Sequence, residues 1–146
     1  MNTVKEQGEL AEARFAVKAV EHGLIVSEPL GDSAPYDRIV DNGSTLFKVQ
    51  IKSTSDLQSR GRKKGAPSYK VMAARGGRNK IGYKAKEVDF FACHIIPLDI
   101  WYVLPWEATQ GAKTLNFYTY KKDSTGKYEQ YKEAWHLLKE QGNGQD

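Results

Sequence analysis

The chain has 146 residues, of which 40% are hydrophobic, and a formal net charge of +4. This length predicts a single domain over residues 1–140 with a frayed tail at 141–146, and the hydrophobic fraction excludes wholesale disorder. No apolar stretch approaches the ~20 residues that span a bilayer, and no signal-peptide region is visible, so we predict a cytoplasmic protein with no membrane partner. The single cysteine, Cys93, excludes an intrachain disulfide and is predicted to be buried.

The net charge conceals an uneven distribution along the chain. From Lys52 to Lys86 there are eleven Lys and Arg residues and one acid, a net charge of +10, whereas the remainder of the chain carries −6. Such a segment suits a polyanion such as nucleic acid. Charged loops also occur because they are well solvated, and this alternative stays open.

Residues 3–22 are predicted to form a helix, since they are rich in Ala, Glu and Lys and are followed by Gly23, a favourable helix C-cap. On a helical wheel, Glu9 and Glu12 fall on the side of Phe15 that should face the core. Carboxylates there are costly without a partner. Either they reach water from the first turns, or a cationic group lies across the interface.

The next pattern predicts a β-hairpin. Residues 36–40 and 45–52 flank Asn42-Gly43, and Asn-Gly favours a two-residue turn. That turn places Asp37 opposite Lys48 and on one face with Gln50 and Lys52, whereas a loop one residue longer would separate them. The remaining pattern predicts an α/β fold with a mixed β-sheet flanked by helices. Its expected elements are strands at 24–27, 68–73, 90–96, 100–104 and 114–120, loops at 53–67 and 75–80, and a closing helix at 128–139.

The polar hairpin face and the first helix together suggest a metal site. Asp37, Gln50 and Glu12 offer oxygen ligands, which suit Mg²⁺ or Mn²⁺. A lysine beside the metal, Lys52, can orient or deprotonate a water or neutralise developing charge. Combined with the positive segment, this set points to phosphodiester hydrolysis.

Pro35-Tyr36-Asp37 followed by Gln50-Ile51-Lys52 resembles the motif of the PD-(D/E)XK nuclease superfamily. It departs from that motif by the inserted Tyr36 and by Gln50 where an acid is usual. The form Val49-Gln50-Ile51-Lys52 is similar to the small group I intron-encoded homing endonucleases. The leading Gly8-Glu9-Leu10-Ala11-Glu12 resembles the first helix of the superfamily, and the position of Glu12 is similar to that in archaeal Holliday-junction resolvases.

The resemblance implies a restriction-endonuclease-like core of helix, antiparallel hairpin, crossover helix and strand. It implies that Asp37, Gln50, Glu12 and the Ile51 carbonyl hold Mg²⁺ or Mn²⁺ while Lys52 assists the attacking water. The expected activity is that of a Mg²⁺-dependent DNA endonuclease, with a Holliday-junction resolvase or a catalytically inactive DNA-binding module of the same fold as alternatives.

The expected partner is double-stranded or branched DNA, and cutting both strands favours a homodimer or homotetramer. RNA is not excluded by charge. Tyr83 is predicted to be a packing residue. The residues expected to contact DNA are Arg60, Arg62, Lys63, Lys64, Arg75, Arg78 and Lys80, with Lys84 and Lys86 close behind in the sequence.

Overall fold

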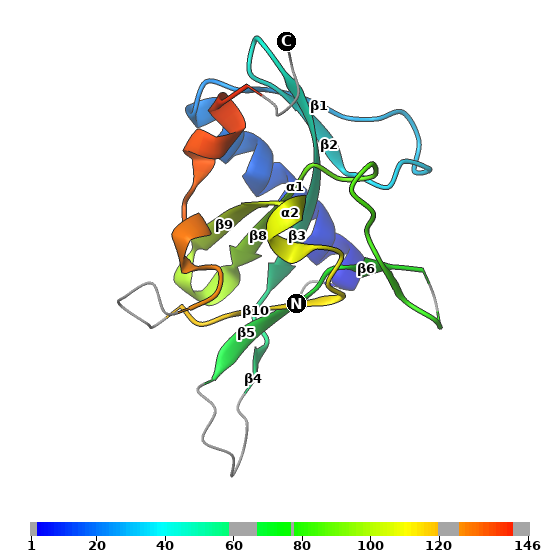
Figure 1. The fold of residues 1–146 in the computed structure, drawn as a ribbon, viewed down its shortest axis with the longest axis vertical. Helices are drawn as coiled ribbons and strands as arrows, with labels where there is room; N and C mark the ends of the chain where they lie inside the picture. The colour runs from blue at the N-terminus through cyan, green and yellow to red at the C-terminus, as the bar shows by residue number, and fades with distance from the viewer. Residues whose placement is uncertain (1–2, 59–66, 77, 120–125, 142–146) are drawn as a thin grey trace.

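The computed structural model describes residues 3–58, 67–76, 78–119 and 126–141. Its centre is a mixed sheet in the order β1-β2-β3-β8-β9, in which β3 and β8 are parallel and the other neighbours are antiparallel (Figure 1). The mixed α/β class is therefore confirmed. The strands of this sheet are β1 (Ile25–Ser27), β2 (Arg38–Asp41), β3 (Leu46–Thr54), β8 (Phe90–Ile95) and β9 (Ile100–Pro105).

Helix α1 (Val4–Glu21) confirms the helix predicted at the start of the chain. It begins with a capping box in which Thr3 and Glu6 exchange side-chain and backbone hydrogen bonds. It ends before Gly23, whose φ of +80° is left-handed. The helix buries Phe15 against one face of the main sheet, where the alternating apolar side chains of β3, Phe47, Val49 and Ile51, belong to the same core cluster.

The hairpin forms as predicted, but the register of its two strands differs from the predicted one. Arg38 pairs with Val49 and Ile39 pairs with Lys48, so the expected pairing of Asp37 with Lys48 is wrong. The cause is a longer loop. Asn42 closes it by accepting hydrogen bonds from the backbone N–H groups of Ser44 and Thr45, and by donating to the carbonyls of Leu138 and Glu140.

Helix α1 packs on one face of the main sheet, and the second face is covered mainly by strands. A smaller sheet, ordered β10-β5-β4, places Tyr69 and Leu115 in a second core cluster with Phe91 of β8. In Figure 1 this sheet extends below the main sheet. The strands of this region are β4 (Leu57–Gln58), β5 (Ser68–Met72), β10 (Thr114–Phe117), and the separate pair β6 (Ala74–Arg75) and β7 (Ile81–Gly82).

The parallel strands β3 and β8 are joined by a crossover, as the resemblance implied. The implied crossover helix is not found in the described crossover residues, 55–58, 67–76 and 78–89, which contain strands and turns. In β5, buried Tyr69 and Val71 alternate with Lys70 and Met72, a pattern that suits pairing with β10.

The predicted closing helix is also wrong. The segment forms two 3₁₀ helices, η2 (Glu129–Tyr131) and η3 (Trp135–Lys139). Between them Glu133 has a φ of +52°, its backbone N–H donates to the Trp101 carbonyl, and its carboxylate accepts from the Trp101 N–H. These hydrogen bonds between Glu133 and Trp101 of β9 take the place of the predicted continuous helix. Trp135 nevertheless packs against Phe15, with ring centroids 5.7 Å apart.

Two further short elements, η1 (Ile96–Leu98) and α2 (Trp106–Thr109), flank β9. The predicted strand at 114–120 is present as β10, while Tyr120 and the expected tail at 142–146 lie outside the described residues. No described helix is long and apolar enough to cross a membrane.

Candidate functional site

Asp37 lies at the point where β2 begins, and the local backbone fixes its carboxylate. Its N–H donates to the Val49 carbonyl at 2.9 Å, although the register partner of Val49 is Arg38. Two residues of one strand thus oppose one residue of the other, the arrangement of a β-bulge, which re-aims a side chain. The Asp37 Oδ2 atom accepts a hydrogen bond from the Ile51 N–H at 2.9 Å. The structure therefore brings Asp37 to the Gln50-Ile51-Lys52 segment, as predicted.

The environment of the Asp37 carboxyl favours a cation. Burial raises its pKa above the ordinary value, and the Ile51 N–H and the charges of Lys52 and Arg38 offset that effect in part. A carboxylate that loses hydration in this way gains more than an exposed one from a nearby positive charge. The site thus contains a partly desolvated carboxylate, and a bound metal ion would stabilise its negative charge.

Gln50 and Ile51 supply neutral oxygens beside Asp37. Gln50 is 8% exposed, and its side-chain amide has no hydrogen-bond partner within the described ranges of the chain. The N–H and C=O of one strand residue point to the same side. Because the Ile51 N–H points to Asp37, its carbonyl faces the edge on which Asp37 lies. An unpartnered amide and a carbonyl suit a hard, oxygen-preferring ion.

Lys52 follows on the same face of β3 as Gln50. Its Nζ atom lies 6.0 Å from the ring centroid of Tyr83, and its charge acts on the Asp37 carboxyl. Tyr83 is 6% exposed and packs in the second core cluster, as predicted, but its position beneath Lys52 was not anticipated. Cys93 is buried nearby, and burial raises the pKa of its thiol to about 12, which leaves it unreactive.

Glu12 meets a cationic group across the helix–sheet interface. Arg38 lies 3.0 Å from its carboxylate and 3.3 Å from that of Glu28, and also donates to the Asp37 carbonyl. Burial, then the charge of Asp37, raises the pKa of Glu12. Of the two alternatives for Glu12, the cationic partner is therefore the one observed, whereas Glu9 is exposed.

A polar cavity of about 250 Å³ opens beside Asp37, between α1 and the loop that leads into β2. Arg38 and Glu28 belong to its lining and were missed in the sequence. The sequence indicated only that the inward-facing carboxylate of Glu12 needs a cationic partner. It did not identify that partner as Arg38. The lining residues are Glu12, Glu28, Pro29, Gly31, Asp32, Ala34, Tyr36, Asp37 and Arg38.

The residues present fit a hydrated divalent ion. Among the described residues, no three His, Cys, Asp or Glu side chains gather into a metal site. Asp37, the Gln50 amide and the Ile51 carbonyl form instead a small oxygen set of low charge, which matches the way Mg²⁺ binds through a few protein oxygens and keeps several waters. Glu12 can add its charge only by sharing it with Arg38.

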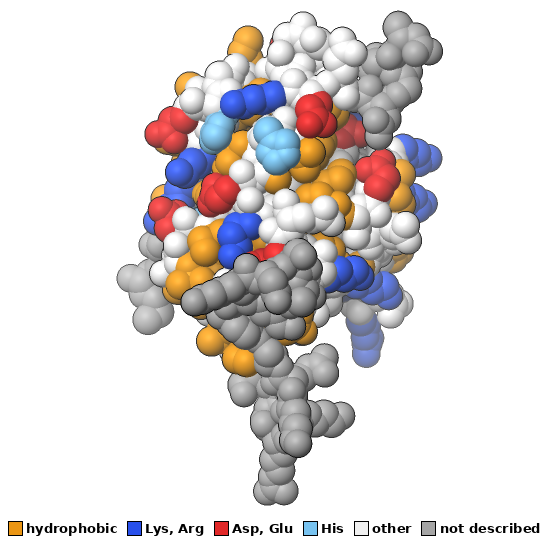
Figure 2. All heavy atoms as spheres, turned by 60° about the vertical axis from the view of Figure 1, so that its left-hand side comes forward, with side chains coloured by type: hydrophobic (Ala, Val, Ile, Leu, Met, Phe, Trp, Pro, Cys, Tyr) orange, Lys and Arg blue, Asp and Glu red, His pale blue; other side chains and the backbone are white. Residues whose placement is uncertain are grey.

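The basic segment is partly described. Arg60, Arg62, Lys63 and Lys64 lie outside the described residues. Arg75 is paired with Glu87 at 2.7 Å, so some of its charge is already neutralised. Arg78, Lys80, Lys84 and Lys86 are exposed. Positive charge does not cover the whole surface, since the face seen in Figure 2 carries basic and acidic side chains intermixed.

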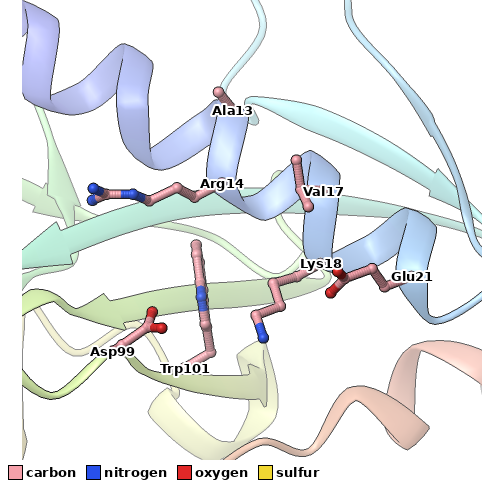
Figure 3. A pocket seen from close by; sticks show the side chains of 7 residues that line it. All are labelled: Ala13, Arg14, Val17, Lys18, Glu21, Asp99 and Trp101. Atoms are coloured by element: carbon pink, nitrogen blue, oxygen red, sulfur yellow. The ribbon is translucent and has the colours of Figure 1, made fainter.

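Another cavity, of about 350 Å³, lies along α1 on the side of β9 (Figure 3). Arg14 and Lys18 point into it together with Glu21 and Asp99, beside Trp101. The mixture of charges does not favour a polyanion. None of the predicted catalytic residues lines this cavity, so it does not belong to the site around Asp37.

Comparison with known proteins identifies relatives over nearly the whole chain. A family model described as PD-(D/E)XK endonuclease matches residues 1–138. A solved structure of a bacterial homing endonuclease, I-Ssp6803I, is similar to this chain with a TM-score of 0.75 and 28% sequence identity, over 94% of each chain. Comparison with curated proteins finds no match.

Proposed function

The chain belongs to the PD-(D/E)XK endonuclease family, and we propose that it hydrolyses DNA with Asp37, Gln50 and Lys52 around a divalent metal ion. The family, the fold and the nuclease function expected from the sequence are confirmed. The observation that supports the assignment of the site is the hydrogen bond from the Ile51 N–H to Asp37. It holds the motif aspartate against the segment that carries the motif lysine.

The site would hold Mg²⁺ or Mn²⁺ through Asp37, the Gln50 amide and the Ile51 carbonyl, with Glu12 contributing charge. When bound, such an ion polarises a phosphate oxygen and lowers the pKa of a coordinated water. Lys52 orients the attacking water or takes its proton, and its ammonium stabilises negative charge that develops on the phosphate. The neutral Gln50 weakens the attraction for the metal, which Glu12 offsets.

The substrate we propose is a specific double-stranded DNA site, with the chain acting as a homing endonuclease. The 28% identity to a bacterial homing endonuclease over 94% of the chain supports this specificity. Since one site cuts one strand, double-strand cleavage calls for a homodimer or homotetramer. A cytoplasmic location also stays a prediction from the sequence.

Two alternatives rest on specific residues. Gln50 in place of an acid favours a DNA-binding module that has lost catalysis. The position of Glu12 favours a Holliday-junction resolvase. A comparison of four-way junction DNA with linear duplex at equal salt separates the resolvase, because recognition of a branched shape survives salt that removes nonspecific binding.

Cleavage of supercoiled plasmid tests the proposed site. Asp37→Asn keeps an oxygen for the Ile51 N–H, and Lys52→Ala removes the ammonium. We expect each to lower the cleavage rate with Mg²⁺ or Mn²⁺ by more than about 100-fold while DNA binding persists. The matched controls are Asp41→Asn on β2 and Lys48→Ala on β3. Full cleavage by either site variant refutes the assignment, and an inactive wild type supports the binding module.

A further inference from the structure

The ammonium of Lys52 lies over the neutral ring of Tyr83. Among the ion pairs formed by the described residues, none includes Lys52. Its ammonium instead contacts the ring of Tyr83, with the Nζ atom 6.0 Å from the ring centroid. Aromatic rings attract cations at this distance through the negative face of their π-system.

The Tyr83 ring is fixed by the core beneath it. It packs edge-on against Phe91 of β8, with centroids 5.7 Å apart. The indole N–H of Trp106 donates to the Tyr83 carbonyl at 2.6 Å, which anchors the backbone as well. The hydroxyl of Tyr83 makes no hydrogen bond with any residue in the described ranges, so the ring rather than the hydroxyl makes the structural contacts.

A close backbone contact at Gly82 allows Tyr83 to take this position. A Cβ atom at Gly82 would lie 1.9 Å from the Gly111 carbonyl oxygen, so the backbone before Tyr83 approaches that of Gly111 more closely than any other residue permits. The segment carrying Tyr83 is thereby seated against the loop that follows α2. Several independent contacts thus determine where the ring lies.

We infer that Tyr83 is a positioning residue for Lys52, because its fixed ring holds the ammonium beside Asp37 without forming an ion pair. This inference rests on the proposed function of Lys52. A carboxylate in the place of Tyr83 would hold the lysine more strongly but would cancel the charge that acts on the phosphate. Without the ring, the ammonium would be free to pair with Asp37 and compete with the metal for its oxygens. The neutral ring keeps both groups available.

Two variants separate the ring from the hydroxyl. Tyr83→Leu removes the ring, and we expect the single-turnover cleavage rate at saturating DNA and Mg²⁺ to fall about tenfold, the size of one partly buried cation–π contact. DNA affinity should stay unchanged. Tyr83→Phe keeps the ring and should restore the rate to within about twofold. The matched control is Tyr128→Leu, since Tyr128 is buried in the same cluster and also lies beneath a lysine, Lys127, at 5.4 Å.

A spectroscopic readout reports the contact without catalysis. In protein with ¹³C-labelled lysine, the ring of Tyr83 should shift the ε-methylene signal of Lys52 upfield. We expect the shift to persist in Tyr83→Phe and to disappear in Tyr83→Leu, with no change in Tyr128→Leu.

The outcomes distinguish this inference from the proposed function. If wild-type protein does not cleave DNA, the proposed function fails, and the NMR shift still decides whether the ring holds Lys52. If wild type cleaves and Tyr83→Leu cleaves equally fast, the positioning role is refuted. Equal slowing in Tyr83→Phe would assign the effect to the hydroxyl, and equal slowing in Tyr128→Leu would assign it to lost stability, and both contradict the inference.

Discussion

The guanidinium of Arg38 lies 3.0 Å from the carboxylate of Glu12 and joins helix α1 to the first residues of β2. The same group lies 3.3 Å from Glu28 and donates to the Asp37 carbonyl. One side chain therefore pairs with two acids, whose combined charge it offsets only in part, and contacts the bulge that aims Asp37. The charge balance around the proposed metal site depends on this arginine as much as on the acids.

Arg38→Ala should destabilise the fold. The change leaves Glu12, whose side chain is 29% exposed, beside Asp37 without its cation. We expect a loss of about 1–2 kcal/mol in the free energy of unfolding, less than the roughly 3–5 kcal/mol for a fully buried pair. Urea denaturation measures it. Glu28→Gln is the control, because that side chain is 68% exposed and should change stability by less than about 0.5 kcal/mol. Equal effects of the two variants would contradict this account.

Asp37→Asn should stabilise the metal-free protein at pH 7 while it abolishes cleavage. Burial raises the pKa of Asp37 above its ordinary value of 3.8. The folded state therefore binds this proton more readily than the unfolded state, so ionisation of Asp37 lowers stability at neutral pH. We expect the variant to gain about 0.5–2 kcal/mol, as is usual when a functional residue is replaced.

The pH dependence has a definite sign. The gain should be complete above the raised pKa of folded Asp37 and should vanish as the pH falls below 3.8, where the carboxyl is protonated in both states. Thermal melting of both proteins across this range, without divalent metal, measures the difference. A gain that increased toward low pH would show that the cause is not desolvation of this carboxyl.

The motif residues could be predicted because their chemistry and spacing are local. Gln50, Ile51 and Lys52 are consecutive, and strand alternation alone decides which face each occupies. The register of the hairpin could not be predicted. It depends on Asn42, whose amide bonds to Leu138 and Glu140, almost a hundred residues away in the sequence.

The same limit explains the C-terminal segment and the supporting residues of the site. Local propensity favours a helix through Glu133, but a hydrogen bond to Trp101 on β9 holds that residue at positive φ. Glu12 was recognised as needing a cation, yet Arg38 could be identified only once α1 and β2 were packed together. Tertiary contacts therefore determine the conformation at Glu133 and the partner of Glu12, which the local sequence pattern does not specify.

The salt dependence of DNA binding should identify which basic residues meet phosphates. Lys80 is exposed, so Lys80→Ala should reduce the slope of log affinity against log salt concentration by about 1. Arg75→Ala should reduce it less, because Glu87 already pairs with Arg75 at 2.7 Å. Fluorescence anisotropy with a labelled duplex at several KCl concentrations measures both slopes. Lys5→Ala, on α1 and outside the basic segment, is the control and should leave the slope unchanged.

Two Gly→Ala substitutions should change stability in opposite directions. Gly8 lies within α1, where an added methyl group would meet no neighbouring atom within 4 Å, so Gly8→Ala should add about 0.5–1 kcal/mol through helix propensity. At Gly82 the methyl would lie 1.9 Å from the Gly111 carbonyl oxygen, which is backbone and cannot rotate away. Gly82→Ala should therefore cost about 1–3 kcal/mol.

Gly82→Ala should also slow cleavage by more than its loss of stability explains, because the shifted backbone carries Tyr83 away from Lys52. Melting temperatures give the stability change, and cleavage rates measured well below the melting transition give the effect on the site. Gly8→Ala should melt higher and cleave at the wild-type rate. A Gly82→Ala protein that is destabilised but cleaves normally would contradict this link between the backbone at Gly82 and the position of Lys52.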